Sequence, residues 1–490
     1  MITFSQVPQA QNRSEDYCVS VNGTAVPVYT CRISAVPFNT VWPGHQRPLD
    51  QAEEVCYINL VGDGEANLQI TPKTKGTEGR IMLKPYSKNI CPTVREGKIC
   101  FTLREYRGYV LEIGDYHGLL YVFYNPPFFC EDPRTVTHYF GPGVHTPGKV
   151  ELHSDESVYV DKDALIYGCF FAKNAKNIRI FGNGILNDRD EIRPAAIADM
   201  VGNLRFYDCK NVCVEGVGLT DSAEWCFSLF HCFDVTARNI HIFGQWRYNT
   251  DGIDVVNCQR VSVTDSFIHS FDDTLAVKGI DHYSYESNRD LRFEGCVLWC
   301  DWGKTCEIGL ECAAKECTDI VFRDCDLLRA GDTACDIQNG HWAEVHHVIF
   351  ENLRVELEDF YTLPVYQRNQ NHKYDGDTGT EIPRIFSVHN RQFSEVYPGF
   401  REGEHGIPPK DENFASAHHI TVKDIALICT KDYEDRFGKE CGKIRLLNFL
   451  PTTKFHHLSV QNVTLNGRPL SPAEFTVQAE GVSHDILQLS

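Results

Sequence analysis

A short alternating pattern that recurs from about residue 150 onward constrains the fold of this chain more than any other feature. Each copy is a strand-sized run in which apolar and polar residues alternate, followed by a polar turn and a second short run. Neighbouring copies stand about 23–30 residues apart, a period typical of solenoids. The pattern includes runs that begin at Asn211, Val235, Arg260, Leu291, Asp319, His347, His419 and His457.

The residue types in these runs indicate strands. Val, Ile, Leu, Phe and Cys recur with period two, and there is too little helical periodicity for a helical or leucine-rich repeat. Parallel strands stacked coil upon coil bury both their hydrogen-bond ladders and their inward side chains, which suits this composition. The sequence therefore predicts an all-β fold, with a right-handed parallel β-helix over residues 145–490.

Two segments depart from the repeat. Residues 360–418 interrupt the spacing and are rich in Tyr, Arg, His, Asn, Pro and Gly. Because long insertions in compact folds are commonly functional, we expect this one to form a lid over the active face. Residues 1–140 instead hold separate β-like runs parted by Gly, Pro, Asn and Asp. They predict an antiparallel β-sandwich-like domain, with the boundary between Pro126 and Lys149.

Composition limits the environment and the partners. The formal charge of −20 argues against nucleic acid, whose binding needs Lys and Arg to neutralise phosphates. No run approaches the ~18–20 apolar residues that cross a bilayer, and the first residues lack the pattern of a secretory signal peptide. The 21 cysteines show no paired zinc-binding spacing, and many fall inside strand-like runs. We therefore expect reduced thiols, a cytoplasmic location, no metal or cofactor, and neither nucleic acid nor membrane as a partner; an oligomer is left open.

Three aspartates stand one predicted coil apart. Asp251 lies in the motif Asn249-Thr-Asp-Gly-Ile-Asp254, and Asp272 follows 21 residues later, directly before Asp273. Residues one coil apart are stacked neighbours near the strand spacing of about 4.8 Å, so we expect the three carboxylates to share one face. Like charges placed so close together repel each other, and such a cluster calls for a functional reason.

Acid–base cleavage of a glycosidic bond provides that reason. One carboxyl group stays protonated and donates to the leaving oxygen, while an ionised one activates water or attacks the anomeric carbon. Neighbouring carboxylates shift each other's pKa values apart, which allows this division of roles. Aspartates that only cap turns and form side-chain ladders explain a single Asp in a solenoid better than they explain the whole set.

The same residues resemble the polygalacturonase family, glycoside hydrolase family 28. The resemblance covers about residues 150–360 and rests on Asn249-Thr-Asp-Gly-Ile-Asp, on Asp272-Asp273 with Lys278 after them, on Asn177-Ile-Arg-Ile-Phe-Gly-Asn-Gly-Ile-Leu-Asn, and on Trp225 before Cys232. It implies an inverting hydrolase with Asp272 as the general acid, and with Asp251 and Asp273 positioning and deprotonating the water.

Two positions depart from the family pattern. Where the family has Gly-His-Gly, this chain reads Trp302-Gly-Lys-Thr-Cys, which puts Lys304 or a neighbour in the place of the His. The Arg-Ile-Lys motif that grips the substrate carboxylate is replaced by a run containing Asp336, which is expected to repel a galacturonate. The run from Val297 also resembles the dextranase-type family 49, whose members carry a β-sandwich before the β-helix. These departures indicate a substrate other than ordinary polygalacturonate.

Polar and aromatic residues around the aspartates are candidates for binding the sugar. Aromatic rings pack on the C–H faces of pyranoses, and amide, ammonium and carboxylate groups bind hydroxyls. The expected substrate-binding residues are Asn249, Lys278, Trp299, Trp302, Lys304, Glu307, Glu311 and Gln338. His341, His346 and His347 lack a ligand-like setting and are interpreted as satisfied core or surface histidines rather than a metal site.

The resulting hypothesis is a glycoside hydrolase that acts on an oligosaccharide. In a cytoplasmic protein this substrate is an imported one, for which exo-action on short chains is the better hypothesis. Three alternatives stay open: a polysaccharide lyase, a transferring or cyclising enzyme in which a sugar hydroxyl replaces water, and a non-catalytic glycan-binding β-helix. A lyase needs calcium or a cationic base with uronate-binding cations, and the sequence shows no such set. A binding module has no use for the three aspartates together.

Overall fold

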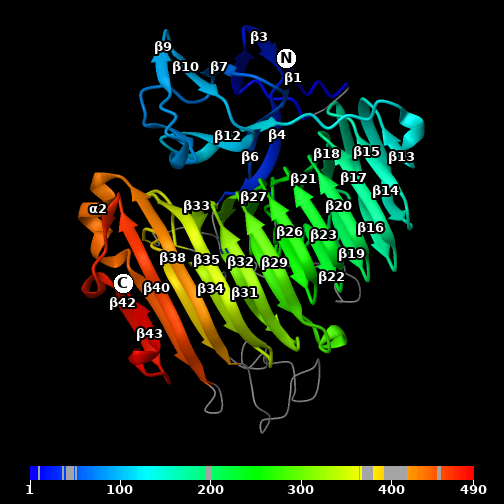
Figure 1. Ribbon diagram of the computed structural model, residues 1–490. Coiled ribbons are helices and arrows are strands. Elements are labelled where there is room, and N and C mark those ends of the chain that lie inside the picture. The colour runs from blue at the N-terminus through cyan, green and yellow to red at the C-terminus, as the bar shows by residue number, and fades with distance from the viewer. Residues whose placement is uncertain are drawn as a thin grey trace.

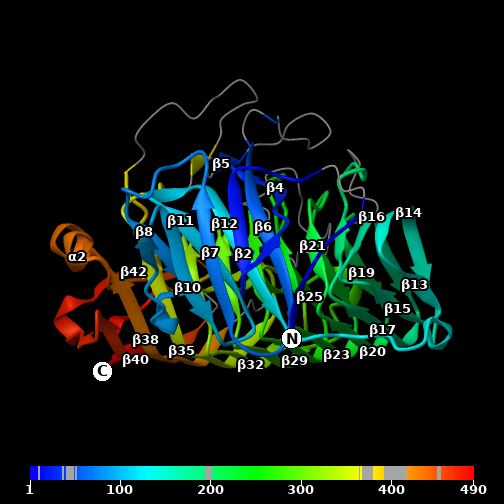
Figure 2. The ribbon, with the colours of Figure 1, turned by 90° about the horizontal axis from the view of Figure 1, so that it is seen from above.

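The computed structural model describes residues 1–8, 12–35, 38–39, 49, 52–193, 201–363, 365–366, 379–390, 416–449 and 454–490. Two smaller sheets come first in the chain, and one long parallel solenoid follows. Figure 1 shows the N-terminal sheets above the row of parallel strands, and Figure 2 shows them lying along this row when seen from above. The all-β architecture confirms the predicted fold class.

The N-terminal sheets pair mostly antiparallel. A six-stranded sheet has the order β1–β6–β12–β11–β8 with β4 beside β6, and a five-stranded sheet has the order β3–β2–β7–β10–β9. The β6–β12 pair is parallel, which the expected antiparallel pattern did not include. The strands are β1 Ile2–Phe4, β2 Tyr17–Val21, β3 Thr24–Val26, β4 Tyr29–Ser34, β6 Ala52–Gly62, β7 Ala66–Pro72, β8 Ile81–Lys84, β9 Thr93–Arg95, β10 Lys98–Leu103, β11 Arg107–Ile113 and β12 Asp115–Asn125.

A shared apolar core joins the two sheets into a sandwich. Val19 and Ile70 of the five-stranded sheet belong to the same buried cluster as Leu60 and Val122 of the six-stranded one. Residues of β7 and β10 alternate between buried and more exposed positions, as expected of a sheet with one face in a core. The sandwich-like part of the predicted fold is therefore confirmed.

Each coil of the solenoid contributes strands to three faces. On the first face, every strand pairs in parallel with the equivalent strand of the next coil. The parallel sheet begins at His138, a few residues before the expected start at residue 145. The first-face strands are β13 His138–Phe140, β15 Ser157–Val160, β17 Lys176–Gly182, β20 Lys210–Glu215, β23 Phe233–Arg238, β26 Gln259–Thr264, β29 Asn288–Glu294, β32 Glu316–Arg323, β35 Glu344–Leu357, β38 Ala417–Cys429, β40 Phe455–Leu465 and β43 Leu487–Leu489.

The second and third faces are built in the same way. Strands β14 Gly143–Leu152 and β16 Ala164–Lys173 contribute to both. The second face continues with β18 Ile185–Asn187, β21 Gly218–Thr220, β24 His241–Phe243, β27 Phe267–Ser270, β30 Val297–Cys300 and β33 Asp326–Ala330. The third face continues with β19 Leu204–Tyr207, β22 Phe227–Phe230, β25 Ile253–Val256, β28 Leu275–Gly279, β31 Lys304–Cys312, β34 Thr333–Asn339, β37 Arg384–Asn390, β39 Lys443–Asn448 and β42 Thr476–Glu480.

Residues in the left-handed backbone region mark one corner of the coils. Their φ values lie between 52° and 60°, a region in which Asn, Asp and His are enriched over other side chains. Each opens or directly precedes one of the sequence copies, so this corner sets the period that the sequence displays. The corner residues are Asn177, Asn211, Asp234, Arg260, Asp290, Asp319, His347, His419 and His457.

The interior of the solenoid is one continuous apolar core. Inward side chains stack in rows, and the ring centroids of Phe293, Phe322 and Phe350 follow one another at 4.7 and 5.1 Å. Free cysteines such as Cys232 and Cys258 are fully buried in the same core. This placement fits their interpretation as small apolar residues.

The N-terminal sandwich packs on the second face of the solenoid. Tyr121 and Phe123 of β12 contact Phe243 and Phe267 of β24 and β27, with ring centroids 4.7 to 5.9 Å apart. Gly108 lies so close to this contact that an added Cβ would come within 2.5 Å of the Phe267 ring. The sandwich therefore closes much of the second face to any substrate.

The expected lid over residues 360–418 falls mostly on residues 364, 367–378 and 391–415, which lie outside the described residues, and it stays a prediction. Within that range β36 Val365–Tyr366 pairs with β5 Phe38–Asn39. Helix α2 spans Lys431–Phe437. Across the described ranges, no helix is long and apolar enough to span a bilayer.

Candidate active site

The structure brings the three predicted aspartates together on the third face. Strand β25 pairs with β28, with Ile253 opposite Leu275, so the turns that precede these strands are also neighbours. Asp251 lies in the first turn, and Asp272 and Asp273 lie in the second. All three residues are almost fully buried, with whole-residue exposures of 1%, 6% and 7%.

Lys278, the last residue but one of β28, is the cation at the centre of the cluster. Its Nζ lies 3.1 Å from Asp273, 3.5 Å from Glu311, 3.6 Å from Asp251 and 3.8 Å from Asp254. Burial alone would lower the pKa of Lys278, but the surrounding carboxylates outweigh it and raise that pKa. A single charged lysine cannot neutralise four carboxylates, so some of them must hold protons.

Asp272 and Asp273 differ in protonation although they are adjacent in the chain. Burial and the charge of Asp273 raise the pKa of Asp272 to about 7. Burial opposes ionisation of Asp273 too, but the Lys278 and Lys304 ammonium groups outweigh it and hold the pKa of Asp273 well below its usual range. Asp273 also accepts a hydrogen bond from the Lys304 backbone N–H at 3.1 Å. Near neutral pH the pair therefore offers one protonated and one ionised carboxyl group.

Asp251 and Asp254 form the more deeply buried side of the cluster. Burial, followed by the charge of Asp254, raises the pKa of Asp251, and burial likewise raises that of Asp254 against the opposing charge of Lys278. Within the described part of the chain, neither Asp254 oxygen has a hydrogen-bond partner. A buried polar group without a partner costs free energy, so this cluster is tolerated rather than favoured by folding.

Strand β31 supplies the next layer of the site. Lys304 Nζ lies 3.9 Å from Glu307, and burial together with the charge of Asp273 raises the pKa of Glu307. Gly303, just before this strand, has no room for a side chain: an added Cβ would lie 2.5 Å from Asp273 Oδ1 and 2.6 Å from Asp272 Oδ1. Lys304, Glu307 and Glu311 thus lie against the aspartates, as the sequence predicted.

Asn249 connects the aspartates to an arginine that the sequence did not indicate. Its Nδ2 donates to Asp272 at 3.4 Å, and its Oδ1 accepts from Arg193 Nη1 at 2.8 Å. Arg193 is held in turn by Glu224 at 2.6 Å. Arg193 stands far from the motif in sequence and outside the repeat copies, so no local pattern points to it.

Asp336 requires a correction. It was expected to stand uncompensated and to repel a substrate carboxylate, but it is fully buried, 3.5 Å from His389 and 3.7 Å from Arg445. Burial raises the pKa of Asp336, but His389 and Arg445 outweigh it and lower that pKa. His389 comes from β37, a regular strand of the third face that lies inside the range 360–418 interpreted as an insertion, and Arg445 comes from β39 beyond it. The sequence spacing therefore could not place them here. Gln338, on the same strand as Asp336, lies opposite His389 and is 9% exposed.

The tryptophans divide between two regions. Trp299 is fully buried between the domains, 4.4 Å from the His269 ring and 6.5 Å from that of Tyr116, so its expected role as a sugar platform is wrong. It points outward from the solenoid, but the sandwich covers that side. Trp302 is half-buried. Trp225 is half-buried next to the cluster, with Lys278 Nζ 5.0 Å from its ring, and is a better platform candidate than Trp299.

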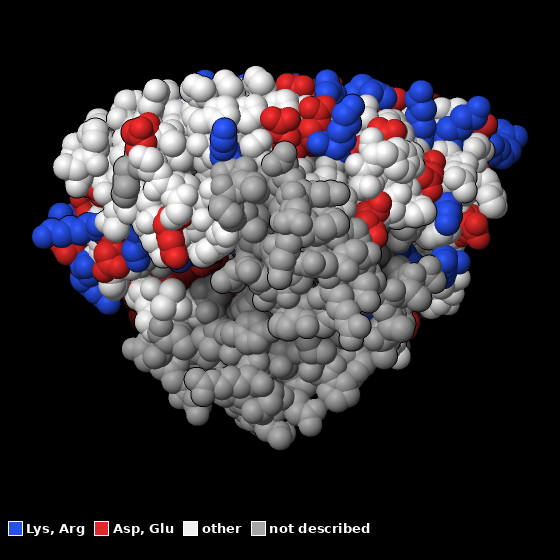
Figure 3. Space-filling view, turned by 90° about the horizontal axis from the view of Figure 1, so that it is seen from below, with Lys and Arg blue, Asp and Glu red and all other residues white. Residues whose placement is uncertain are grey.

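Histidines are absent from the described contacts of the three aspartates. His341 is buried and accepts a hydrogen bond from the Cys312 backbone, and burial lowers its pKa to about 4, as for a satisfied core histidine. His346 and His347 lie on the first face instead. Figure 3 shows Lys and Arg interspersed with Asp and Glu around the described rim of the face seen from below, without one dominant basic patch.

Comparisons with known proteins agree with this arrangement. The family model described as "Glycosyl hydrolases family 28" matches residues 199–356, which hold every residue of the cluster from Asp251 to Glu311. Rhamnogalacturonase A of Emericella nidulans is 25% identical over 225 residues, 46% of this chain and 41% of that protein. Polygalacturonase of Persea americana is 27% identical over 141 residues, 27% of this chain and 30% of that protein.

A solved structure supports the overall architecture. Dex49A from Penicillium minioluteum aligns with a TM-score of 0.57 at 13% identity, covering 99% of this chain and 95% of that one. At this identity the likeness concerns the fold alone, and it includes the sandwich as well as the solenoid. The match spans less than half the length of two curated relatives: 41% of rhamnogalacturonase A of Emericella nidulans and 48% of a probable rhamnogalacturonase A of Aspergillus oryzae. In sequence the chain is similar to family 28 glycoside hydrolases, and in fold to Dex49A.

Proposed function

We propose that this chain is a glycoside hydrolase that cleaves an O-glycosidic bond of an oligosaccharide by acid–base catalysis at Asp251, Asp272 and Asp273. The observation that carries the proposal is the gathering of these buried carboxyl groups on two adjacent turns around Lys278 Nζ. Burial and the charge of Asp273 raise the pKa of Asp272 to about 7, whereas Lys278 and Lys304 lower the pKa of Asp273. Paired carboxyl groups with pKa values driven apart are the arrangement that glycoside hydrolysis requires.

Asp272 is the proposed general acid. Its proton passes to the glycosidic oxygen as the bond to the anomeric carbon breaks, which removes the need to expel an alkoxide. Asn249 donates to Asp272 Oδ2 and is itself fixed by Arg193, so this carboxyl group is held in one orientation. Such positioning is worth as much as the acidity, because a misplaced donor cannot follow the leaving oxygen.

Asp273 is the proposed acceptor of the proton from water, with Asp251 as its positioning partner. Asp273 is the ionised member of the cluster, while Asp251 has a raised pKa and holds a proton more firmly than an ordinary aspartate. A strongly ionised carboxylate is a weak base, which suits a proton that leaves water only as the oxygen bonds to an oxocarbenium-like carbon. We propose that water attacks the face opposite the leaving group, with inversion; one water is consumed, and the proton gained by Asp273 returns to Asp272.

The proposed substrate is a short glycan other than ordinary polygalacturonate. Lys304 and Glu311, whose side chains are 23% and 22% exposed, offer an ammonium and a carboxylate group to sugar hydroxyls, and the half-buried Trp225 offers a ring face. Arg445 and His389 are already engaged by Asp336, so a uronate carboxylate would have to compete for them. We also propose exo-action on an imported oligosaccharide in the cytoplasm, in keeping with the free cysteines of the core.

Two substrates that differ in their leaving group test the assignment of Asp272 as the general acid. Asp272→Asn is expected to lose about 10²–10⁴-fold in kcat on an unactivated oligosaccharide and far less on a dinitrophenyl glycoside, whose leaving group needs no proton. Asp273→Asn is expected to lose similarly on both substrates, because water activation is needed in each case. Asp281→Asn changes an exposed aspartate on η5 Asp281–Tyr283 and serves as the matched control.

Equal rates for wild type and Asp272→Asn on the oligosaccharide panel would contradict the acid assignment. NMR of the first product anomer tests inversion. Product unsaturation would instead indicate a lyase, new glycosidic bonds a transferring or cyclising enzyme, and glycan binding without turnover by any variant a binding module.

A further inference from the structure

The first face carries two columns of histidines near the C-terminal end of the solenoid. His346, His418 and His456 occupy the same position on β35, β38 and β40, in register from coil to coil. His347, His419 and His457 follow directly in sequence and form the second column at the left-handed corner. The site thus lies on a different face from the aspartates and belongs to no part of the proposed reaction.

The rings within each column are stacked. In the first column, centroids lie 5.0 Å apart from His346 to His418 and 4.6 Å apart from His418 to His456, with the planes within 7° of parallel. In the second column, His419 lies 5.2 and 4.6 Å from its neighbours. The columns therefore present repeated imidazole pairs rather than scattered surface histidines.

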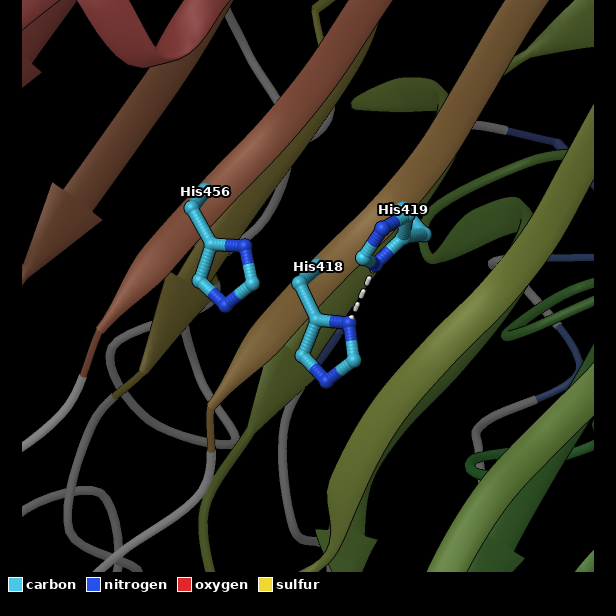
Figure 4. Close-up of side chains that lie close together, drawn as sticks. All are labelled: His418, His419 and His456. Atoms are coloured by element: carbon cyan, nitrogen blue, oxygen red, sulfur yellow. Dashed lines mark hydrogen bonds between the residues drawn. The ribbon is translucent and has the colours of Figure 1, made fainter.

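Each pair points its Nδ1 atoms at each other. Nδ1 of His418 lies 2.7 Å from Nδ1 of His419, drawn as the dashed line in Figure 4, and the pair from the coil before shows 2.6 Å. Two lone pairs cannot face each other at this distance, so a proton must stand between them. A position that holds a proton between two imidazole nitrogens is also a position for a metal ion, which needs only a small opening because metal–nitrogen bonds are about 2.0–2.1 Å.

Carboxylates fix which nitrogen is available. Glu344 accepts from His418 Nε2 at 2.8 Å, and Glu316 accepts from His346 Nε2 at 3.1 Å. A neutral imidazole that donates from Nε2 keeps its lone pair on Nδ1. A carboxylate on the outer nitrogen of the ring is the usual support of a metal-binding histidine, since it sets the tautomer and raises the basicity of the other nitrogen.

We infer that His418, His419 and His456 form a binding site for a divalent transition-metal ion such as Zn²⁺. Their ligand nitrogens lie within 4.8 Å of one another, and two of the three side chains are half-buried while His419 is exposed. Figure 4 shows His418 and His419 with facing Nδ1 atoms on one strand and the His456 ring beside that of His418 on the neighbouring strand. Imidazole suits Zn²⁺, Cu²⁺ and Ni²⁺ better than it suits Mg²⁺ or Ca²⁺. The ion would join β38 to β40 and so clip the last coils together.

The sequence did not predict this site, because His346 and His347 alone offer no third ligand. The other pairs come from coils beyond the insertion, and only the register of β35, β38 and β40 shows that they stack. Histidine also fits the left-handed corner as Asn and Asp do, so its presence there has a structural explanation as well. The experiment must therefore distinguish histidines that only stack on one another from histidines that bind a metal ion.

Calorimetric titration of the untagged, chelator-treated full chain with ZnCl₂ tests the inference. Wild type is expected to bind Zn²⁺ in the micromolar range or tighter, with a rise in thermal midpoint as for any ligand specific to the native state. His419→Asn keeps a residue suited to the left-handed corner and is expected to weaken binding at least about tenfold. His456→Gln tests the third ligand, and His282→Asn changes an exposed histidine elsewhere as the control.

Cobalt substitution identifies the ligands. Co²⁺ bound here is expected to give visible bands without thiolate charge transfer, which excludes binding at the cysteines. Absence of Zn²⁺ binding by wild type, or equal binding by wild type and His419→Asn with circular dichroism unchanged, would reduce the columns to stacked side chains and overturn the inference.

Discussion

Among the described residues, Lys84 and Lys278 are buried lysines surrounded by carboxylates, one in the domain interface and one in the candidate active site. In the interface, Lys84 of β8 lies 3.4 Å from Glu112, 3.7 Å from Glu356 and 3.8 Å from Glu358. In the site, Lys278 lies 3.1 to 3.8 Å from four carboxylates. Charge and distance alone do not distinguish the two clusters.

Closure and hydrogen bonding do distinguish them. Every side chain of the Lys84 cluster is at most 1% exposed, whereas Asp273 and Glu311 beside Lys278 are 10% and 22% exposed. Lys84 also donates to Tyr361 at 2.8 Å, and each of its glutamates receives at least one hydrogen bond. In the described part of the chain, one oxygen each of Glu112 and Glu356 lacks a partner, whereas Asp254 lacks a partner on both of its oxygens.

The comparison teaches that a buried cation–carboxylate cluster is not by itself a sign of catalysis. The Lys84 cluster fixes the sandwich on the solenoid and is closed to solvent. The Lys278 cluster keeps a route to solvent through Asp273 and Glu311, which is what a group that must exchange protons with a substrate needs. Four variants or conditions test this distinction.

Lys84→Met is expected to have the largest effect, and on stability alone. Removing the cation leaves Glu112 and Glu356 buried without a cation and Glu358 with Arg80 alone, and breaking a buried ion pair costs about 3–5 kcal/mol. The midpoint of urea unfolding measures the loss, and the activity per folded molecule is expected to stay unchanged. Arg80→Met is the matched control, since Arg80 also pairs with Glu358 but is 41% exposed. Similar losses for both variants would mean that burial does not set the strength of this cluster.

Lys278→Met is expected to act mainly on turnover. Without this ammonium group the pKa of Asp273 rises, since Lys304 is then the one remaining cation among those that lower it. We expect kcat to fall about 10²–10³-fold, as for loss of other fixed active-site charges. Single-turnover rates on the substrate found in the panel measure this effect. Lys315→Met, on the exposed turn before β32, should retain full activity. A kcat within twofold of wild type would place Lys278 with Lys84 as a structural residue.

The pH dependence follows from the raised pKa of Asp272. A general acid must be protonated, so kcat/KM is expected to fall tenfold per unit as pH rises above about 7. Stability changes in the same direction, because the folded chain holds this proton more tightly than the unfolded one and loses stability as pH rises from about 4 to about 7. Initial rates measured across pH give this alkaline fall in kcat/KM, and the Asp272→Asn substitution should abolish it. An alkaline limb that persists in this variant would assign it to another group.

The sequence predicted the solenoid because its corner residues repeat. Asn211, Asp319 and His457 occupy left-handed positions that suit few residue types, and the alternating runs after them face a continuous core. The one-coil spacing of Asp251 and Asp272 was visible for the same reason. The parallel β6–β12 pair was not, because its strands are separated by most of the sandwich and local pattern carries no information on such pairing.

The site was predicted only where residues share the repeat. Arg193, His389 and Arg445 reach it from outside the regular spacing. His389 lies within the range 360–418 and Arg445 beyond it, and this interruption of the spacing hides their register. Trp299 was misplaced for a different reason. Its side chain points outward from its strand, as a sugar platform should, and only the docked sandwich turns that position into a core. The packing of the sandwich decides which outward face of the solenoid is covered, and the repeat pattern carries no information on that packing.

Substitution of Trp225, beside the Lys278 cluster, is expected to have the smallest effect of the four and to act on substrate binding alone. The Trp225 ring lies 6.1 Å from Phe230 at an interplanar angle of 10°, and Lys278 stands 5.0 Å from it, so it extends an aromatic row to the edge of the aspartate cluster. Trp225→Ala is expected to raise KM about five- to tenfold, near 1 kcal/mol, because a stacked ring binds the substrate and the transition state alike. Trp225→Phe keeps a ring and should recover most of this loss in steady-state assays. A fall in kcat with KM unchanged would show instead that Trp225 acts by holding Lys278, which would make it a positioning residue and leave the sugar platform to Trp302.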